Sequence, residues 1–283
     1  MKYPEILSIQ SEPVTMAYTD KDTILYALGL GAGADPLDPR ELKFVYEEDL
    51  RALPTMNVLL GAGSGGILSG AGVNYLMLLH GEQRLRVYKP LPPQGHIFST
   101  SRCLGVVDKG AAKGAVLHLE STILDEKTRE HYATTIMSLF CRGDGGFGGP
   151  TEDPLPSHQV PSRPHDMEVA LKTRPDQAAL YRLNGDRNPL HIDLKVAKKA
   201  GFDRPILHGL CTYGISCRAV MQAYCDLDPA RIKTFDARMS SPVHPGETIV
   251  TRMWKDGATI SFECSVAERP VTVVKNGRAD IVE

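Results

Sequence analysis

NGDRNPLHID, residues 184–193, brings a carboxylate, an amide and an imidazole within six residues, on Asp186, Asn188 and His191. The glycine before Asp186 and the proline after Asn188 favour a turn over a regular helix, so these side chains need not follow helical spacing. They can converge on one small polar site, and turns on a rigid scaffold commonly carry catalytic residues. The structural alternative is an Asx-type turn, in which Asp186 and Asn188 bind their own backbone and His191 opens a helix.

The order of elements around this turn occurs twice in the chain. DTILYALGLGAGADPLD, from Asp22, matches DQAALYRLNGDRNPLHID, from Asp176. In each copy an acidic helix start leads through Leu-Tyr into a glycine-rich turn and then Pro-Leu. The first copy has glycines and alanines, and two extra residues, where the second has its polar groups. One copy keeps the chemistry, so we expect the other to be a binding surface or a structural partner.

A loop-like segment separates the two copies. It runs from Gly143 to Pro164 and contains GDGGFGG followed by five prolines, which is typical of a hinge or linker. We therefore expect an N-terminal half over residues 1–149, a linker over residues 150–164 and a C-terminal half over residues 165–283.

Each half is expected to combine a helix with a sheet. Alternating apolar residues and β-branched content predict three antiparallel strands at the end of each half. A helix precedes them, Ile67 to His80 in the first half and Gly209 to Tyr224 in the second. This pattern predicts an α+β fold in which each sheet cradles one long helix.

Composition excludes several classes of protein. Hydrophobic residues make up 42% and charged residues 23% of 283 residues, with a net charge of −2, which is typical of a soluble globular protein and calls for no nucleic-acid partner. Apolar stretches are too short to span a membrane, and the N-terminus lacks a secretory signal. Six scattered cysteines predict buried reduced thiols without structural zinc. We expect a cytoplasmic protein; the alternative is the peroxisomal matrix, entered without a Ser-Lys-Leu tail.

GAGSGG, residues 61–66, is a competing motif. Gly61, Gly63 and Gly66 satisfy G-x-G-x-x-G after the strand-like MNVLL, and Glu82 lies about 20 residues on, as in a dinucleotide site. The alternation of helices and parallel strands that such a site requires is absent from the rest of the pattern. The simpler interpretation is a flexible glycine-rich loop before a helix.

His208-Gly209 precedes an apolar helical run, and Pro205 fixes the approach to it. The first free backbone N–H groups of this helix, near Gly209, can bind an oxygen that gains negative charge. The structural alternative is a glycine that allows close packing of helix on sheet.

Two further groups have simpler explanations. Lys195, Lys198 and Lys199 lie on an expected helix and could meet phosphates, although a solvated basic face is more typical. His80 and Gly81 would end the first long helix as a C-terminal cap.

Taken together, GDRNPLHID followed by RPILHGL resembles the MaoC-like hydratases, and most closely the hydratase 2 enzymes. The segments YTDKDTILYALGLG, LHGEQRLRVYKPLP, Asp108-Lys109-Gly110 and GGFGG occur in the order that this family shows and extend the resemblance over nearly the whole chain. It implies a double hot-dog fold, two tandem repeats that each wrap an antiparallel sheet around a helix, and a homodimer.

The resemblance also implies an activity and a site. The activity is (R)-specific hydration of trans-2-enoyl-CoA, an acyl-CoA thioester, with no metal or redox cofactor. In the family's motif the aspartate and histidine act on the water and the asparagine helps to hold water or substrate, which places these roles on Asp186, His191 and Asn188. Gly209 would offer its N–H to the thioester oxygen. The implied contacts with the acyl or CoA parts of the substrate are His80, Gly81, Lys109, Arg187, Pro189, Leu190 and Met239.

The residue types suit this chemistry. Hydration needs a base that takes a proton from water and an acid that delivers one to the α carbon, while charge gathers on the thioester oxygen. The alternatives are a hot-dog acyl-CoA thioesterase, a nucleotide-dependent oxidoreductase built on residues 61–66, and a catalytically silent acyl-binding module. The first half, without the polar turn, is expected to make room for the acyl chain.

Overall fold

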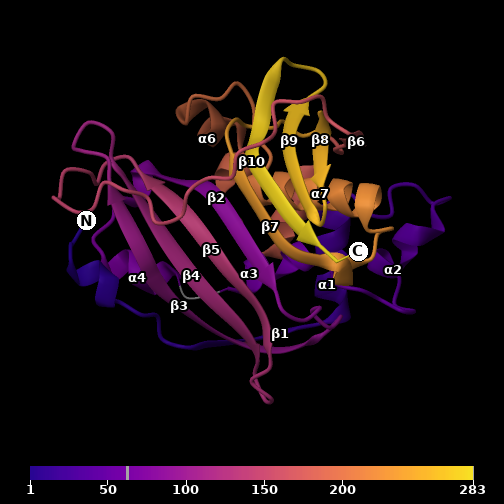
Figure 1. Ribbon diagram of the computed structural model, residues 1–283, viewed down its shortest axis with the longest axis horizontal. Coiled ribbons are helices and arrows are strands. Elements are labelled where there is room, and N and C mark those ends of the chain that lie inside the picture. Colours follow the sequence, from indigo (N-terminus) through magenta and orange to yellow (C-terminus); the bar gives the residue numbers. More distant parts are fainter. Residues whose placement is uncertain (62–63, 283) are drawn as a thin grey trace.

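The computed structural model describes residues 1–61 and 64–282. Within them ten strands form one antiparallel sheet in the order β1-β3-β4-β5-β2-β7-β10-β9-β8-β6. The strands of the two halves lie side by side in Figure 1, the first half at the left and the second at the right. The strands are β1 (Val14–Tyr18), β2 (Leu78–Val87), β3 (Gly95–Asp108), β4 (Ala115–Asp125), β5 (His131–Cys141), β6 (Met167–Lys172), β7 (Ile232–Met239), β8 (Thr248–Asp256), β9 (Thr259–Val266) and β10 (Val271–Ile281).

Helices cover one face of this sheet. The α-helices are α1 (Asp20–Gly29), α2 (Leu42–Val45), α3 (Asn57–Leu60), α4 (Ser64–Gly70), α5 (Gln177–Tyr181), α6 (Leu194–Lys199) and α7 (Gly209–Tyr224). Short 3₁₀ helices are η1 (Glu5–Ser8), η2 (Pro39–Glu41), η3 (Pro54–Met56), η4 (Tyr75–Met77), η5 (Arg182–Asn184), η6 (Pro189–His191) and η7 (Pro229–Arg231). The expected α+β class and the strand triplets β3–β5 and β8–β10 are confirmed.

The two halves share one sheet because β2 pairs with β7, where Leu85 lies opposite Phe235 and both side chains are buried. Residues 142–166, between β5 and β6, contain no helix or strand. Hydrogen bonds hold this segment to the sheet: Arg84 Nη2 donates to the Leu155 carbonyl over 2.8 Å, and His118 Nε2 lies 3.1 Å from Asp153 Oδ1.

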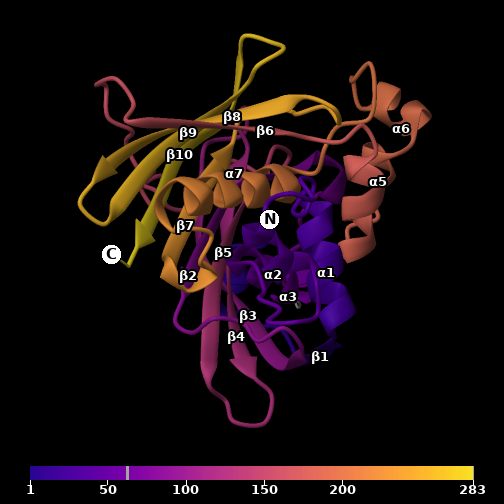
Figure 2. The same ribbon diagram turned by 90° about the vertical axis from the view of Figure 1, so that its right-hand side faces the viewer.

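Helix α7 is the central helix of the second half, as the sequence predicts. It crosses the face of the second-half strands (Figure 2), and every residue from Cys211 to Met221 is buried, as expected for a helix that is apolar on nearly all sides. Tyr213 donates its hydroxyl hydrogen to the Phe235 carbonyl over 2.6 Å, which ties the helix to β7. The start of α7 therefore has a fixed position relative to the sheet.

The first half has no comparable helix among its described residues. The prediction of a helix from Ile67 to His80 is wrong beyond Gly70, where α4 ends; β2 begins at Leu78. Gly72 follows with a φ of +65°, a left-handed conformation that ends a helix readily. Helices α3 and α4 stand in place of one long helix. The core under α4 includes Ile67 and Leu117.

In the described residues, the glycine motif at residues 61–66 does not have the surroundings that a dinucleotide site requires. MNVLL was expected as a strand but is helical, in η3 and α3, because tertiary packing overrides the β propensity of a short apolar run. Gly63 lies outside the described residues. Glu82, expected near a ribose, lies on β2 with its Oε1 2.6 Å from Arg84 Nε. The described strands pair only in antiparallel fashion, so no βαβ unit surrounds the motif.

The repeat visible in the sequence is also visible in space. Helices α1 and α5 lie side by side (Figure 2), and Tyr26 and Tyr181 of the repeated Leu-Tyr pairs have ring centroids 6.2 Å apart. All six cysteines are free and buried, as expected. Across the described residues, no helix has the length and apolar character needed to cross a bilayer.

Candidate active site

The turn after η5 has the Asx geometry that the sequence offered as a structural alternative. Gly185 has a φ of +115°, which favours glycine. The backbone N–H of Asn188 donates to Asp186 Oδ1 over 3.1 Å, and that of Leu190 donates to Asn188 Oδ1 over 3.0 Å. The structural and chemical interpretations are compatible, because Oδ1 of Asp186 holds the turn while Oδ2 faces His191.

His191 ends η6 and is held as a neutral imidazole. Its Nδ1 lies 2.9 Å from the Ile206 carbonyl oxygen, so Nδ1 carries the proton and Nε2 keeps a lone pair. That Nε2 lies 4.0 Å from Asp186 Oδ2. Burial lowers the pKa of His191 below its ordinary value, against smaller opposing effects of the Ile206 carbonyl and the Asp186 charge. The pair is therefore a carboxylate facing an imidazole lone pair.

The start of α7 lies beside this pair. Gly209 is the first residue of the helix and is exposed, so its N–H belongs to the first turn, whose donors have no partner within the helix. A Cβ added to Gly209 would lie 3.4 Å from Met239 Cγ. The structure thus places Gly209 and Met239 together.

His208 joins the turn to the helix, a role that the sequence did not reveal. Its ring stacks on His191 with centroids 3.7 Å apart and an interplanar angle of 28°. Its Nε2 lies 3.1 Å from the backbone carbonyl oxygen of Asp186. The only signal in the sequence was the His-Gly pair before an apolar helix, which says nothing about ring stacking.

Asp186, His191 and His208 could be read as a metal site, since they offer three ligand atoms within 4.8 Å of one another. A metal ion lies about 2 Å from a histidine nitrogen, near the plane of the ring. Two rings stacked 3.7 Å apart cannot both direct a lone pair at one ion without a large rotation. The geometry does not favour an ion here, and the expectation of no metal stays a prediction.

His80 enters the same region from β2. The predicted C-terminal cap at His80 and Gly81 is wrong, because these residues lie in a strand, at an irregularity in the β2–β5 ladder. Burial lowers the pKa of His80 to about 4, against smaller opposing effects of hydrogen bonds to the Glu82 backbone and the Gln83 side chain and of the Asp186 charge. Nε2 of His80 is buried and has no hydrogen-bond partner in the described part of the chain. It is a free polar group at the site.

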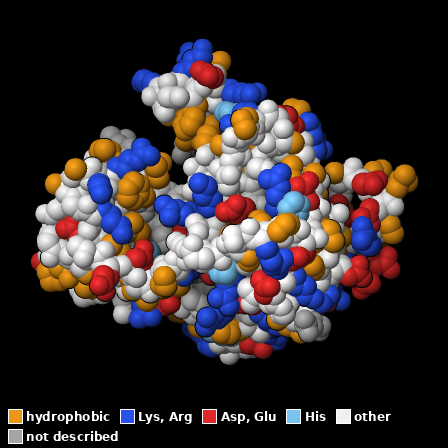
Figure 3. Space-filling model, turned by 45° about the horizontal axis from the view of Figure 1, so that its top comes forward, with side chains coloured by type: hydrophobic (Ala, Val, Ile, Leu, Met, Phe, Trp, Pro, Cys, Tyr) orange, Lys and Arg blue, Asp and Glu red, His pale blue; other side chains and the backbone are white. Residues whose placement is uncertain are grey.

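Lys109 lies in the turn between β3 and β4. A hollow of about 540 Å³ is lined by Met77, Lys109, Ala112, Lys113, Phe140 and Arg142. The turn that carries Lys109 is fixed by Asp108, whose carboxylate accepts backbone N–H bonds from Gly146, Gly110 and Gly148. These bonds, the one from Gly146 above all, lower the pKa of Asp108. GGFGG therefore has a local function, to hold the lysine turn. Figure 3 shows a hollow with blue Lys and Arg side chains on its rim.

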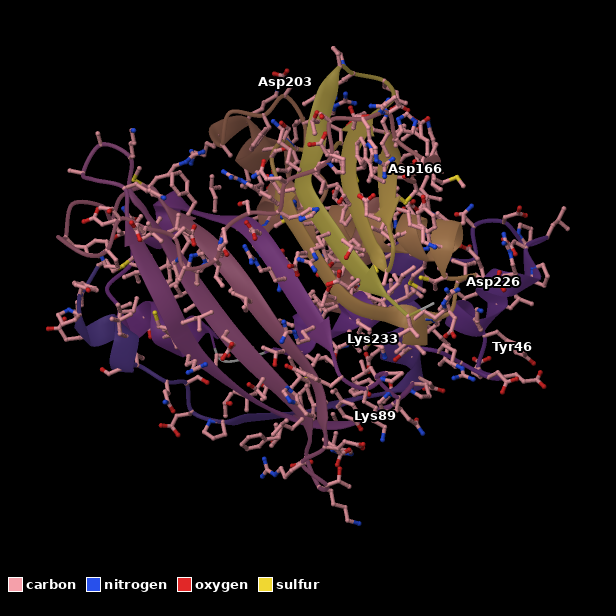
Figure 4. The ribbon with its side chains drawn as sticks, in the orientation of Figure 1. Tyr46, Lys89, Asp166, Asp203, Asp226 and Lys233 are labelled. Atoms are coloured by element: carbon pink, nitrogen blue, oxygen red, sulfur yellow. The ribbon has the colours of Figure 1, made fainter. Side chains whose placement is uncertain are left out.

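The remaining predicted residues are more exposed. Arg187 and Pro189 are exposed, whereas Leu190 is half-buried. The three lysines of the segment after His191 lie on α6 and are all exposed, which agrees with the solvated basic face. Asp203, in the loop from α6 to α7, projects at the top of the molecule in Figure 4. This part of the chain forms an exposed rim beside the site.

Two family models match the two halves. The MaoC like domain matches residues 157–276, and the MFE-2 hydratase 2 N-terminal domain matches residues 16–143. The chain is 42% identical over 275 residues to the peroxisomal multifunctional enzyme type 2 of Mus musculus, covering 94% of this chain and 37% of that protein. It spans little more than a third of that relative. It is 40% identical to enoyl-CoA hydratase 2, peroxisomal, of Arabidopsis thaliana, covering 93% of this chain and 90% of the relative.

Solved structures agree with these matches. The crystal structure of a MaoC-like dehydratase from Phytophthora capsici superposes with a TM-score of 0.88 at 34% identity, covering 100% of this chain and 99% of that one. A Mycobacterium tuberculosis protein described as a double hotdog fold superposes with a TM-score of 0.58 at 14% identity, covering 96% of each chain, and supports the fold alone. The chain belongs to the MaoC-like hydratase 2 family and has its double hot-dog fold.

Proposed function

We propose that this chain catalyses (R)-specific hydration of trans-2-enoyl-CoA to (3R)-3-hydroxyacyl-CoA, and the reverse dehydration. The observation that carries the proposal is the 4.0 Å separation of Asp186 Oδ2 and His191 Nε2 beside the free N–H groups of α7. The name of the Arabidopsis relative, which this chain matches over most of its length, supports the reaction class.

The pair is suited to hold one water molecule. A water whose oxygen lies about 2.8 Å from two acceptors that are 4.0 Å apart sees them at an angle of roughly 90°, close to its own bond angle. The water oxygen then bonds to C3 as one water proton passes to the pair, and the pair delivers one proton to C2. The sum is addition of H and OH across the double bond. Both proton transfers use Asp186 and His191.

Gly209 supplies the third element of the mechanism. Attack at C3 moves charge to the thioester oxygen, and the Gly209 N–H at the positive end of the α7 dipole would stabilise that charge. One such donor typically supplies about 3 kcal/mol. The amide nitrogen of Asn188 is a further donor for water or thioester, and the unpartnered Nε2 of His80 is a further polar group for water.

The basic hollow around Lys109 is suited to the CoA phosphates. Lys109, Lys113 and Arg142 provide three cations beside the apolar Met77 and Phe140. Met77 ends η4 directly before β2 and lies three residues before His80, a span of at most roughly 10 Å. The extended arm of CoA, from thioester to diphosphate, is longer than this, so it can reach from the catalytic turn to the hollow. We place the phosphates here.

The acyl chain is proposed to enter the first half. The short helices α3 and α4 stand where the second half has the 16-residue α7, and Met239 lies beside Gly209 and directly follows the β7 residues that pair with β2. The length and branching of the chain depend on packing around these short helices. A series of enoyl-CoA substrates of increasing length measures this directly.

The experiment that tests the function follows three signals in one assay. We expect loss of enoyl absorbance, no release of free CoA, and a (3R) product in chiral analysis. Release of free CoA without hydration would instead support the thioesterase alternative. A (3S) product, or no change with any chain length, would contradict the proposal.

Assembly and location complete the proposal. We propose a homodimer, which light scattering of the purified protein tests; a monomer at micromolar concentration would contradict it. We propose the cytosol, with the peroxisomal matrix as alternative, because buried free cysteines suit a reducing compartment. A fluorescent fusion in the source cell distinguishes the two.

A further inference from the structure

The His208 ring is a physical link between the two parts of the site. It immediately precedes Gly209 at the start of α7, and its Nε2 reaches the Asp186 carbonyl over 3.1 Å. One ring face carries His191 at 3.7 Å, and Tyr181 packs with a centroid distance of 4.9 Å. The side chain is 1% exposed, so none of these contacts is shared with solvent.

The contacts fix the tautomer of His208. A carbonyl oxygen can only accept, so Nε2 must carry the proton that it donates to Asp186. Nδ1 then holds a lone pair, and it is buried without a partner in the described chain. Burial, and after it the neighbouring His191, lowers the pKa of His208 to about 4. Asp186 and Arg182 are the other charged groups that face the ring. The ring is neutral wherever the protein is folded near pH 7.

We propose that His208 is a positioning residue for the hydration reaction, which clamps the catalytic turn to the start of α7 through its hydrogen bond to the Asp186 carbonyl and its stack under His191. The inference rests on the proposed function and deepens it. Together with the His191–Ile206 hydrogen bond, the clamp sets the distance from the water-binding pair to the oxyanion donor at Gly209.

The clamp has two separable parts. The hydrogen bond fixes the turn, and a misplacement of about 1 Å at a reacting group can cost roughly 100-fold in rate. The stack provides a neutral surface when His191 accepts a proton, whereas a second cation at this distance would repel the charge on His191. His208 must therefore stay neutral while His191 titrates.

Two substitutions separate these parts. His208→Phe keeps a ring face for His191 and removes the donor, whereas His208→Gln keeps a donor near the position of Nε2 and removes the ring. We expect kcat to fall about 100-fold in H208F and about 10-fold in H208Q, with KM within about 3-fold of wild type in both. The matched control is His158→Gln, which makes the same replacement at a histidine whose Nε2 lies 2.8 Å from Ser261 Oγ of β9, and it should leave kcat within about 2-fold.

Either of two kinetic results would overturn the proposal. One is a wild-type kcat in both His208 variants. The other is an equal loss of kcat in all three variants, in parallel with a fall in their melting temperatures. A structural role would produce the second pattern, because lost folding lowers activity without partial rescue by glutamine. Inactive wild-type protein would instead refute the proposed function, and the claim about His208 would then be decided by the following measurement.

Nitrogen-15 NMR of the histidine rings tests the clamp in unmodified protein. The His208 ring, assigned by through-bond correlation to its backbone, should be the Nε2–H tautomer and should not titrate between pH 8 and pH 5. His191 should be the Nδ1–H tautomer over the upper part of this range. Titration of His208 in that window, or an Nδ1–H tautomer, would overturn the proposal whether or not the variants fold.

Discussion

The two matching turns of the repeat, residues 184–193 and residues 29–38, share one Asx hydrogen bond but have different neighbours. In the first turn Asp35 Oδ1 accepts the Leu37 N–H over 2.9 Å, as Asn188 Oδ1 accepts the Leu190 N–H over 3.0 Å in the second. Where the second turn has His191, the first has an aspartate that caps η2. The Asx geometry alone therefore does not make an active site.

The difference lies in what covers each turn. Gly33 donates its N–H to Glu41 Oε2 over 2.7 Å, and Arg218 of α7 donates to Leu30 O over 2.7 Å and pairs with Glu41. Gln177 donates to the Gly29 carbonyl over 2.6 Å. Side chains from the second half thus hold the start of the first turn, residues 29–30, whereas residues 34–37 of that turn are exposed, as residues 185–189 of the second turn are. Of the two roles expected for the first turn, its geometry supports the structural partner.

Loss of His191 is the largest expected effect. His191→Ala removes one of the two groups that exchange protons with water, and kcat should fall about 10²- to 10⁴-fold. The matched control is Asp38→Ala at the equivalent place in the first turn, which should stay within about 3-fold of wild type. Similar losses in both variants would mean that the turns do not differ in function.

The oxyanion role of Gly209 can be tested without removing the helix. Gly209→Pro deletes the N–H at the first helical position, where proline is favoured, and His208 already has a ψ of 136°, which suits a following proline. We expect kcat to fall about 10²- to 10³-fold. Gly209→Ala keeps the N–H, and its Cβ would make an ordinary 3.4 Å contact with Met239, so it should lose less than about 5-fold. Equal activity of the two variants would refute the role.

The buried ion pair that holds the first turn, Arg218–Glu41, should contribute to the free energy of unfolding. Arg218→Met leaves Glu41 buried without its partner, which typically costs about 3 to 5 kcal/mol, measured by urea unfolding. The exposed pair Arg40–Asp38 is the control, because Arg40→Ala should leave the free energy of unfolding nearly unchanged. If Arg218→Met were as mild as Arg40→Ala, the buried pair would not hold the halves together.

Two buried histidines of the site should make the free energy of unfolding depend on pH. Burial lowers the pKa of His80 and His208 to about 4, while unfolded histidine titrates near 6.5. The unfolded chain therefore binds more protons below pH 6.5. The free energy of unfolding should be constant above that pH and fall as pH drops to about 4, by up to about 3 kcal/mol for each histidine. H208Q should remove part of this slope; an unchanged slope would contradict the buried neutral state.

The sequence predicted the second half better than the first. Helix α7 and the strand triplets follow from long periodic segments, and the Asp186–His191 pair follows from a motif within one turn. The prediction of a helix from Ile67 to His80 was wrong because Gly70 and Gly72 interrupt an otherwise apolar run, and the last residues of that run belong to β2. His208 was missed because ring stacking depends on the angle between a turn and a helix, which no spacing records.

One paired measurement tests the central claim, that only the second turn carries chemistry. Asp186→Asn and Asp35→Asn change the same kind of atom in equivalent turns, and both proteins are assayed for hydration of one trans-2-enoyl-CoA with chiral analysis of the product. We predict that Asp35→Asn forms (3R)-3-hydroxyacyl-CoA at close to the wild-type rate and that Asp186→Asn forms about 100-fold less or none. Near-normal formation of the (3R) product by Asp186→Asn would contradict the account.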